Sequence, residues 1–280
     1  MKKLILACAA CVVLCSSMIA INSKKTITSN ADKTAPVKTG SATDNSLEIK
    51  YWIDSLYNTM GLASTNLSRE VFYNACKGYE YLLAQNALIK QGLLTICDFS
   101  QSSNKKRLYV LDLSNCRLLF NTYVSHGHNS GDEYATTFSN SNESHKSCLG
   151  FLRTAETYIG DNGYSMRLDG MENGFNNNAR ERAIVMHGSN YVNGQRASKG
   201  MKMGRSFGCP AVPAAEVKNI INCIKGGSCF FNYYPDKYYA QASRILNADF
   251  NWPVLQNIQL ASVKIPDSLV KLPVHIDPVN

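Results

Sequence analysis

Two short stretches in the second half of the chain decide how its fold is interpreted: VMHGSNYVNG at residues 185–194 and GRSFGCPAV at residues 204–212. In the first, an apolar run leads into His187, and Gly188 follows. This order predicts a β-strand that presents an imidazole at its end, where the glycine lets the backbone turn.

The second stretch places a thiol in an unusual setting. Cys209 stands between Gly208 and Pro210, shortly before an apolar helical pattern for which Pro213 suits the first position. A thiol close to the positive end of a helix is favoured as thiolate, and a nearby imidazole can serve as base and then as acid. The two stretches together predict a cysteine nucleophile for acyl transfer.

Each residue alone has a plainer interpretation. A histidine beside a strand is more often a hydrogen-bonded structural residue, and a single cysteine more often belongs to the core or to a disulfide. The combination of the two stretches favours catalysis.

The order of these motifs resembles the catalytic domain of the YkuD-type L,D-transpeptidases, specifically their murein L,D-transpeptidase branch. Further similarity lies in VSHGHNSG (residues 124–131), FSNS (138–141), RLDG (167–170) and FNYYPD (231–236), so that it covers residues 47–236. The resemblance implies a mainly β fold, an L,D-transpeptidase-type β-sandwich with one helix after the nucleophile and additional N-terminal α-helices.

The same resemblance implies roles for seven residues. Cys209 is expected as the nucleophile and His187 as its base, while Gly208 contributes to an oxyanion site and Ser206 lines the approach. Arg205 is expected to bind a substrate carboxylate, because guanidinium can do so in bidentate fashion. The expected catalytic residues are Cys209, His187, Ser206 and Gly208, and the expected substrate-binding residues are Arg205, His126 and Tyr191. Phe207 departs from the broader family, which has a histidine there.

The segment between Gly188 and Gly208 is strongly basic: it contains Arg196, Lys199, Lys202 and Arg205 and no acidic residue. Such charge favours a thiolate and attracts carboxylates, although a solvated surface loop is the simpler interpretation for the outer lysines.

The His126-Gly-His128 triplet suggests a metal site, but a site needs a third placed ligand. We expect no metal and no cofactor, and we expect His126 to end a strand at the rim of the substrate pocket.

The N-terminus has the pattern of a secretory signal: Lys2 and Lys3 precede an apolar run over residues 4–15. We expect a signal peptide at 1–20, with an uncleaved anchor as the alternative, and a flexible tether at 21–46. A helical segment at 47–92, the catalytic domain at 93–236 and a packed tail at 237–280 complete the expected organisation. The protein is then periplasmic or otherwise extracytoplasmic.

Export would place the cysteines in an oxidising compartment. Three of the ten lie in the signal, and the remaining seven allow three bridges and one free thiol. We expect Cys209 to be free and favour a bridge between Cys223 and Cys229, since Gly226 and Gly227 let the chain reverse between them.

The composition excludes several classes of protein. With 280 residues, 45% hydrophobic, 18% charged and a net charge of +8, the chain is neither disordered nor a polytopic membrane protein. The expected function is an exported L,D-transpeptidase acting on peptidoglycan stem peptides. An L,D-carboxypeptidase and a catalytically silent peptidoglycan-binding module are the alternatives. We expect no nucleic-acid partner, and membrane contact only through an uncleaved signal.

Overall fold

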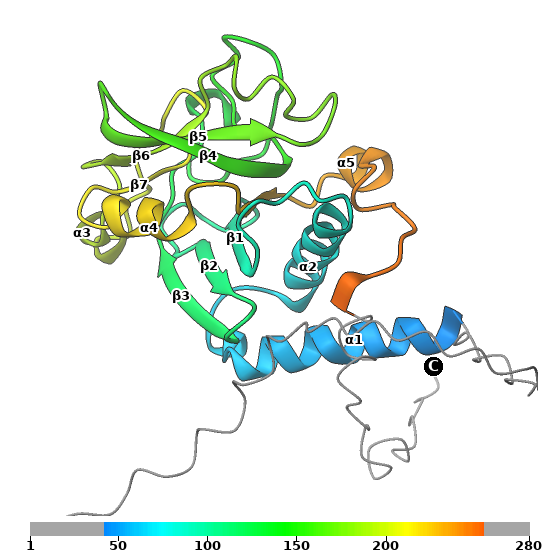
Figure 1. Cartoon of the computed structure of the whole chain (residues 1–280). Coiled ribbons are helices and arrows are strands. Elements are labelled where there is room, and N and C mark those ends of the chain that lie inside the picture. Colours follow the sequence, from blue (N-terminus) through cyan, green and yellow to red (C-terminus); the bar gives the residue numbers. More distant parts are fainter. Residues whose placement is uncertain (1–41, 255–280) are drawn as a thin grey trace, which may run out of the picture. The chain divides into compact units, whose positions relative to one another are not determined.

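A computed structural model describes residues 42–254 of the chain (Figure 1). The expected signal peptide, most of the expected tether and the tail beyond residue 254 lie outside the described residues. Within residues 42–254, no helix has both the length and the apolar character needed to cross a membrane.

Eight strands form the framework of the protein. They join one sheet in the order β3-β2-β1-β8-β4-β5-β6-β7. The mainly β prediction is therefore confirmed. Their bounds are β1 Leu93–Asp98, β2 Leu108–Asp112, β3 Arg117–Thr122, β4 Gly150–Gly160, β5 Gly163–Gly170, β6 Val185–Ser189, β7 Ala211–Pro213 and β8 Cys229–Tyr233.

The last strand of the chain lies in the centre of the sheet. β8 pairs in parallel with β1, where Thr95 lies opposite Phe230, and antiparallel with β4, where Phe151 lies opposite Phe231. The rings of Phe151 and Phe231 stack with centroids 4.1 Å apart. β8 thus joins β1–β3 to β4–β7.

Both faces of the central strands are buried. Along β8, Cys229 and Phe231 join one hydrophobic cluster, whereas Phe230 joins a second. The second cluster also collects side chains from β2, β5 and β6 and from helix α4 (Val217–Ile224), so distant parts of the curved sheet enclose one core. Figure 1 shows β4 and β5 crossing above β2 and β3. This is how a single continuous sheet produces sandwich-like packing.

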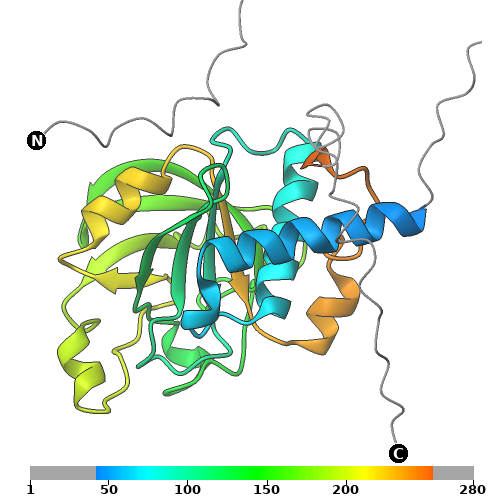
Figure 2. The same cartoon turned by 90° about the horizontal axis from the view of Figure 1, so that it is seen from below.

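Two N-terminal helices cover the first cluster, as predicted (Figures 1 and 2). These are α1 (Ala42–Thr59) and α2 (Arg69–Ala84), and the Ser68 side chain caps α2 by accepting a hydrogen bond from Val71 N–H at 3.2 Å. A Cβ atom at Gly78 would lie 1.9 Å from the Phe151 ring, so only glycine lets α2 approach the sheet this closely.

The remaining helices are short: η1 (Leu62–Ser64), η2 (His128–Ser130), α3 (Gly194–Ser198) and α5 (Lys237–Ala242). α5 is held by the buried carboxylate of Glu172, which accepts hydrogen bonds from the Tyr239 and Ser243 hydroxyls at 2.8 and 2.5 Å. This contact fixes the start of the C-terminal segment to the loop that follows β5.

The expected disulfide framework is not present in the structure. All seven cysteines between residues 42 and 254 are free thiols, and four of them are buried. Cys223 and Cys229 do not pair, because Cys229 packs in the first cluster and Cys223 packs against the second, on the other side of the sheet.

Two local expectations are also corrected. Pro213 does not begin a helix but ends strand β7, and α4 starts only at Val217. The charges of residues 105–107 predict a solvated strand entrance, but Arg107 is fully buried.

Candidate active site

The expected nucleophile lies in a tight turn. The Ser206 hydroxyl donates to the Cys209 carbonyl at 2.6 Å and accepts from Gly208 N–H at 3.1 Å, so a single side chain closes the turn from both sides. Gly208 has φ of 120°, and a Cβ atom there would lie 2.8 Å from the Lys146 carbonyl oxygen. Only glycine fits this position without strain.

The turn is attached to the segment around residues 125–128. Ser206 N–H donates to the His126 carbonyl at 3.0 Å, and Ser125 N–H donates to the Ala211 carbonyl at 2.8 Å. The Ser147 hydroxyl adds a bond to the Gly208 carbonyl at 3.2 Å. These contacts fix the backbone on both sides of Cys209.

The Cys209 thiol itself touches the end of the loop before β6. It donates to the Ala183 carbonyl at 3.6 Å and accepts from Val185 N–H at 3.4 Å. Burial raises the pKa of this thiol, opposed by the Val185 hydrogen bond and the charge of Arg182. The expectation of a helix-stabilised thiolate is therefore wrong: strand β7 lies between Cys209 and α4, and desolvation is the largest effect.

His187 lies on the strand beside the nucleophile. It pairs with Ala211 in the parallel β6–β7 ladder, and Cys209 lies two residues before Ala211. Cys209 itself lies in the turn before β7, and its sulfur accepts from the N–H of Val185, which lies two residues before His187 on β6. Burial lowers the pKa of His187, which favours a neutral ring.

The tautomer of His187 follows from its contact. Its Nδ1 lies 3.0 Å from the Gly188 carbonyl oxygen, which can only accept, so Nδ1 carries the proton and Nε2 keeps a free lone pair. The ring makes no hydrogen bond with the thiol in the described part of the chain. The site thus consists of a neutral imidazole on β6 and a neutral thiol in the turn that leads into the paired strand β7.

Gly208 and Cys209 differ as candidate oxyanion donors. Gly208 N–H is committed to the Ser206 hydroxyl, whereas Cys209 N–H donates to no other residue between 42 and 254. Only the second N–H is open to a substrate oxygen in this structure.

Arg205 is tied to the loop after η2. Its Nη1 donates to the Gly131 carbonyl at 2.9 Å and lies 3.5 Å from the Asp132 carboxylate, which also pairs with Lys202. The guanidinium thus holds the basic loop against residues 128–132, which leaves it less free for a substrate carboxylate than expected.

His126 is buried rather than placed at a pocket rim. Its Nδ1 accepts from the buried Arg107 guanidinium at 2.7 Å, and Arg107 also donates to the Val124 carbonyl. Burial, together with the charge of Arg107, lowers the pKa of His126 to about 3. A neutral His126 thus lies inside the segment 125–128 to which the nucleophile turn is attached.

Tyr191 packs against the segment that leads into the nucleophile turn, where Gly204 N–H donates to its carbonyl at 3.0 Å. Its pKa is raised by burial and, to a smaller extent, by the charge that Cys209 would carry as thiolate. Tyr191 packs with Val192 and Met203, and a Cβ atom at Gly204 would lie 2.6 Å from its side chain.

A second group of residues near the thiol was not predicted. The Arg182 guanidinium lowers the pKa of Cys209 and donates to the carbonyls of Ser139 and Lys146 at 2.7 and 2.6 Å. Arg182 also lines a pocket of about 330 Å³, which we call the Phe207 pocket. Its lining residues are Asn142, Glu143, His145, Glu181, Arg182, Ala183 and Phe207.

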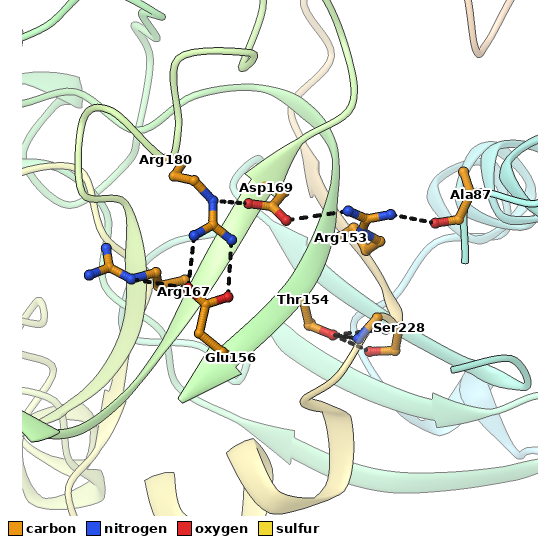
Figure 3. A network of polar contacts seen from close by, with 9 residues as sticks. Ala87, Arg153, Thr154, Glu156, Arg167, Asp169, Arg180 and Ser228 are labelled. Carbon is orange, nitrogen blue, oxygen red and sulfur yellow. Dashed lines mark hydrogen bonds and ion pairs between the residues drawn. The ribbon is translucent and has the colours of Figure 1, made fainter. Parts of the chain in front are cut away.

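The loop that bears Arg182 and Ala183 is anchored to the outside of the sheet (Figure 3). Arg180 bridges two strands, with bonds to Glu156 on β4 at 2.8 and 3.0 Å and to Asp169 on β5 at 2.6 Å. The Arg180 hydrogen bonds lower the pKa of Glu156 to about 2. The position of Ala183 beside the thiol depends on this anchor only three residues away.

No group of three or more His, Cys, Asp or Glu side chains in residues 42–254 is arranged to hold a metal ion. His126 and His128 do not act together: the first is buried, and the second is exposed and bonds with Asn129.

A neutral imidazole on β6 and a thiol in the turn that leads into β7 define the class of protein: a mainly β protein with a candidate cysteine–histidine site. The L,D-transpeptidase catalytic domain family matches residues 63–233, more than half of the chain. The protein therefore belongs to this family.

Solved structures also resemble the chain. They include an L,D-transpeptidase from Mycobacterium smegmatis, with 10% identity, a TM-score of 0.33 and coverage of 51% of this chain and 59% of that one. An L,D-transpeptidase from Stackebrandtia nassauensis has 13% identity and a TM-score of 0.32, and the match covers 66% of this chain and 77% of that one. The helical cell shape determining protein Pgp2 from Campylobacter jejuni has 14% identity and a TM-score of 0.33, and the match covers 58% of this chain and 57% of that one. None of the curated proteins matches the chain.

Proposed function

We propose that this protein is an exported L,D-transpeptidase that acts on peptidoglycan stem peptides through a thioester on Cys209. The observation that carries the proposal is the pairing of β6 with β7, which brings His187, with Nε2 unprotonated, beside the turn that holds Cys209, whose sulfur accepts from Val185 N–H on β6. Membership of the family supports the same reaction class.

In the first step, the Cys209 sulfur attacks the carbonyl carbon of the L,D-peptide bond of a tetrapeptide stem while the thiol proton passes to Nε2 of His187. The carbonyl oxygen becomes negative and is stabilised by Cys209 N–H. The carbon–nitrogen bond then breaks, and His187 returns the proton to the leaving amine of D-alanine. The product is a thioester on Cys209.

In the second step, an amine of another stem attacks the thioester carbonyl. A carbon–nitrogen bond forms, the carbon–sulfur bond breaks, and the sulfur leaves with the bonding electrons. His187 takes the proton lost by the amine and returns it to the thiolate. Because burial raises the pKa of Cys209 and lowers that of His187, the resting pair is neutral and the proton moves during attack.

The test is mass analysis of the intact protein and its products after incubation with a tetrapeptide stem, with and without an amine acceptor. Wild type is expected to gain the mass of the acyl group and to form the cross-linked product. Cys209→Ala and His187→Ala are each expected to lose turnover while remaining folded, and the double variant to be little worse, since the two residues act together.

The other outcomes identify the alternatives. A tripeptide acid that dominates with excess acceptor would assign the protein as an L,D-carboxypeptidase. Absence of any acyl-enzyme would favour a silent peptidoglycan-binding module. Substantial turnover by Cys209→Ala would refute the mechanism.

We also propose that residues 1–20 direct export. Fractionation of cells that produce the full chain, followed by N-terminal sequencing, tests this: an extracytoplasmic protein beginning near residue 21 is expected, and a cytosolic protein with an intact N-terminus would refute it.

A further inference from the structure

The Phe207 pocket adjoins the nucleophile but differs from the basic loop. Ala183, whose carbonyl accepts the Cys209 thiol, forms part of its wall, and Phe207 belongs to the turn that carries Cys209. None of Arg196, Lys199, Lys202 and Arg205 lines it. A group bound in this pocket would approach the sulfur from a side whose lining residues differ in charge from the basic loop.

The lining of the pocket is acidic on balance, because it has two carboxylates, those of Glu143 and Glu181, against one guanidinium, that of Arg182. Glu143 and Glu181 line the pocket, and neither forms an ion pair with a described residue. Asn142 donates one hydrogen bond to Glu181 at 2.6 Å. The guanidinium of Arg182 is directed instead to the Ser139 and Lys146 carbonyls. Both carboxylates are therefore available to a cation from outside.

The pocket also has an aromatic wall that folding does not require. The Phe207 side chain is 72% exposed, and its ring lies 4.5 Å from that of His145, centroid to centroid, at 33°. An exposed phenylalanine beside a nucleophile gains little from burial within its own chain. It offers an apolar surface on which a substrate can pack.

The backbone around the pocket is held in an unusual conformation. Glu143, His145 and Ala183 have φ of 54°, 54° and 51°, and they are three of the five non-glycine residues with positive φ in the described chain. Each costs about 1 kcal/mol or more relative to an ordinary conformation. Their concentration at one pocket indicates that its shape is maintained despite local strain.

We propose that the Phe207 pocket binds the amine-bearing end of the acyl acceptor, with Glu143 and Glu181 attracting its ammonium group and Phe207 packing on its aliphatic chain. This inference rests on the proposed function. The carboxylates of the acyl donor are repelled by the two glutamates, so charge separates the donor from the acceptor. The bound ammonium group first loses one proton to solvent. The neutral amine then attacks the thioester carbonyl and displaces the Cys209 sulfur, and its second proton passes through His187 to the thiolate, as in the second step above.

The experiment compares two nucleophiles on the same acyl-enzyme. Nα-acetyl-lysine amide has a protonated amine that the pocket would attract, whereas hydroxylamine is uncharged at neutral pH and needs no such site. Glu181→Gln is expected to raise the KM for the lysine derivative about three- to fivefold, the effect of one partly exposed ion pair, while leaving acylation and the reaction with hydroxylamine unchanged. Glu143→Gln should raise the same KM by a similar factor. Glu181→Asp, which keeps the charge, should raise it less than Glu181→Gln does.

Asp161→Asn provides the matched control, because it removes one exposed carboxylate from the β4–β5 turn, away from the pocket. It should change neither reaction. If the glutamate variants react equally more slowly with both nucleophiles, or are unchanged with both, the assignment of the pocket is overturned while the proposed function stands. A wild-type protein that forms no acyl-enzyme would overturn the proposed function, and this inference with it.

Discussion

Replacement of Ser206 by alanine tests whether the nucleophile turn is held by one hydroxyl. The side chain is 7% exposed, donates to the Cys209 carbonyl at 2.6 Å and accepts from Gly208 N–H at 3.1 Å. Ser206→Ala removes both bonds and leaves a buried N–H and a carbonyl without their partner. Such a loss destabilises the folded state by about 2 to 3 kcal/mol.

Loss of the two hydrogen bonds should also slow acylation, because they position the backbone of Cys209. If the full loss of about 2 to 3 kcal/mol is added to the activation free energy of acylation, the reaction slows by about 30- to 150-fold. Urea unfolding measures the first effect, and the rate at which the intact protein gains the acyl mass measures the second. Ser198→Ala, which removes an exposed hydroxyl bonded to the Gln195 carbonyl in α3, is the control and should change both by little. Unchanged stability and unchanged acylation in Ser206→Ala would refute the reasoning.

Three further predictions concern titration and burial. Because burial raises the pKa of Cys209, alkylation by iodoacetamide should be slow at neutral pH and accelerate as pH rises past the ordinary cysteine range; a fast plateau on the acid side would contradict this. Native alkylation followed by peptide mapping should spare the buried thiols Cys76, Cys97, Cys148 and Cys229 until the protein unfolds, and a bridged pair would disprove the free-thiol structure. Burial raises the pKa of Glu80 from 4.5 to about 7, so the folded state binds this proton more tightly than the unfolded state and its stabilising contribution is lost as pH rises toward 7. Glu80→Gln should therefore raise the free energy of unfolding by about 3 kcal/mol at alkaline pH and leave it unchanged at acid pH; curves that stay parallel across the range would argue against it.

Features set by local sequence were predictable. The Ser68 cap of α2, the apolar stripe of α4 and the strands around His187 and in 229–233 all follow from spacing along the chain. The order of His187 and Cys209 in their motifs likewise identified a residue of β6 and a residue of the turn before β7 that the β6–β7 pairing brings near each other.

Features that depend on distant neighbours were not predictable. Pro213 reads as a helix start, but the parallel pairing of β7 with β6 holds it in a strand. The charge of Arg107 predicts exposure to solvent. Its burial could not be predicted, because its hydrogen-bond partners, the Val124 carbonyl and His126, come from another segment. Arg182, which acts on the thiol of Cys209, and His145, which packs against Phe207, come from loops far from these residues in sequence, and no motif marks them.

The central position of β8 has a consequence for how the chain is made. This strand is the last of the eight to leave the ribosome, yet it alone hydrogen-bonds both β1 and β4. Until residue 233 has been synthesised, the hairpins β1–β3 and β4–β5 have no shared edge. The contacts that join them span 80 residues of sequence between Phe151 and Phe231 and 135 between Thr95 and Phe230. Pairings of such long range form slowly. A chain that stops just before Cys229 is therefore not a smaller version of this domain but two half-sheets with open edges, prone to pair with other chains.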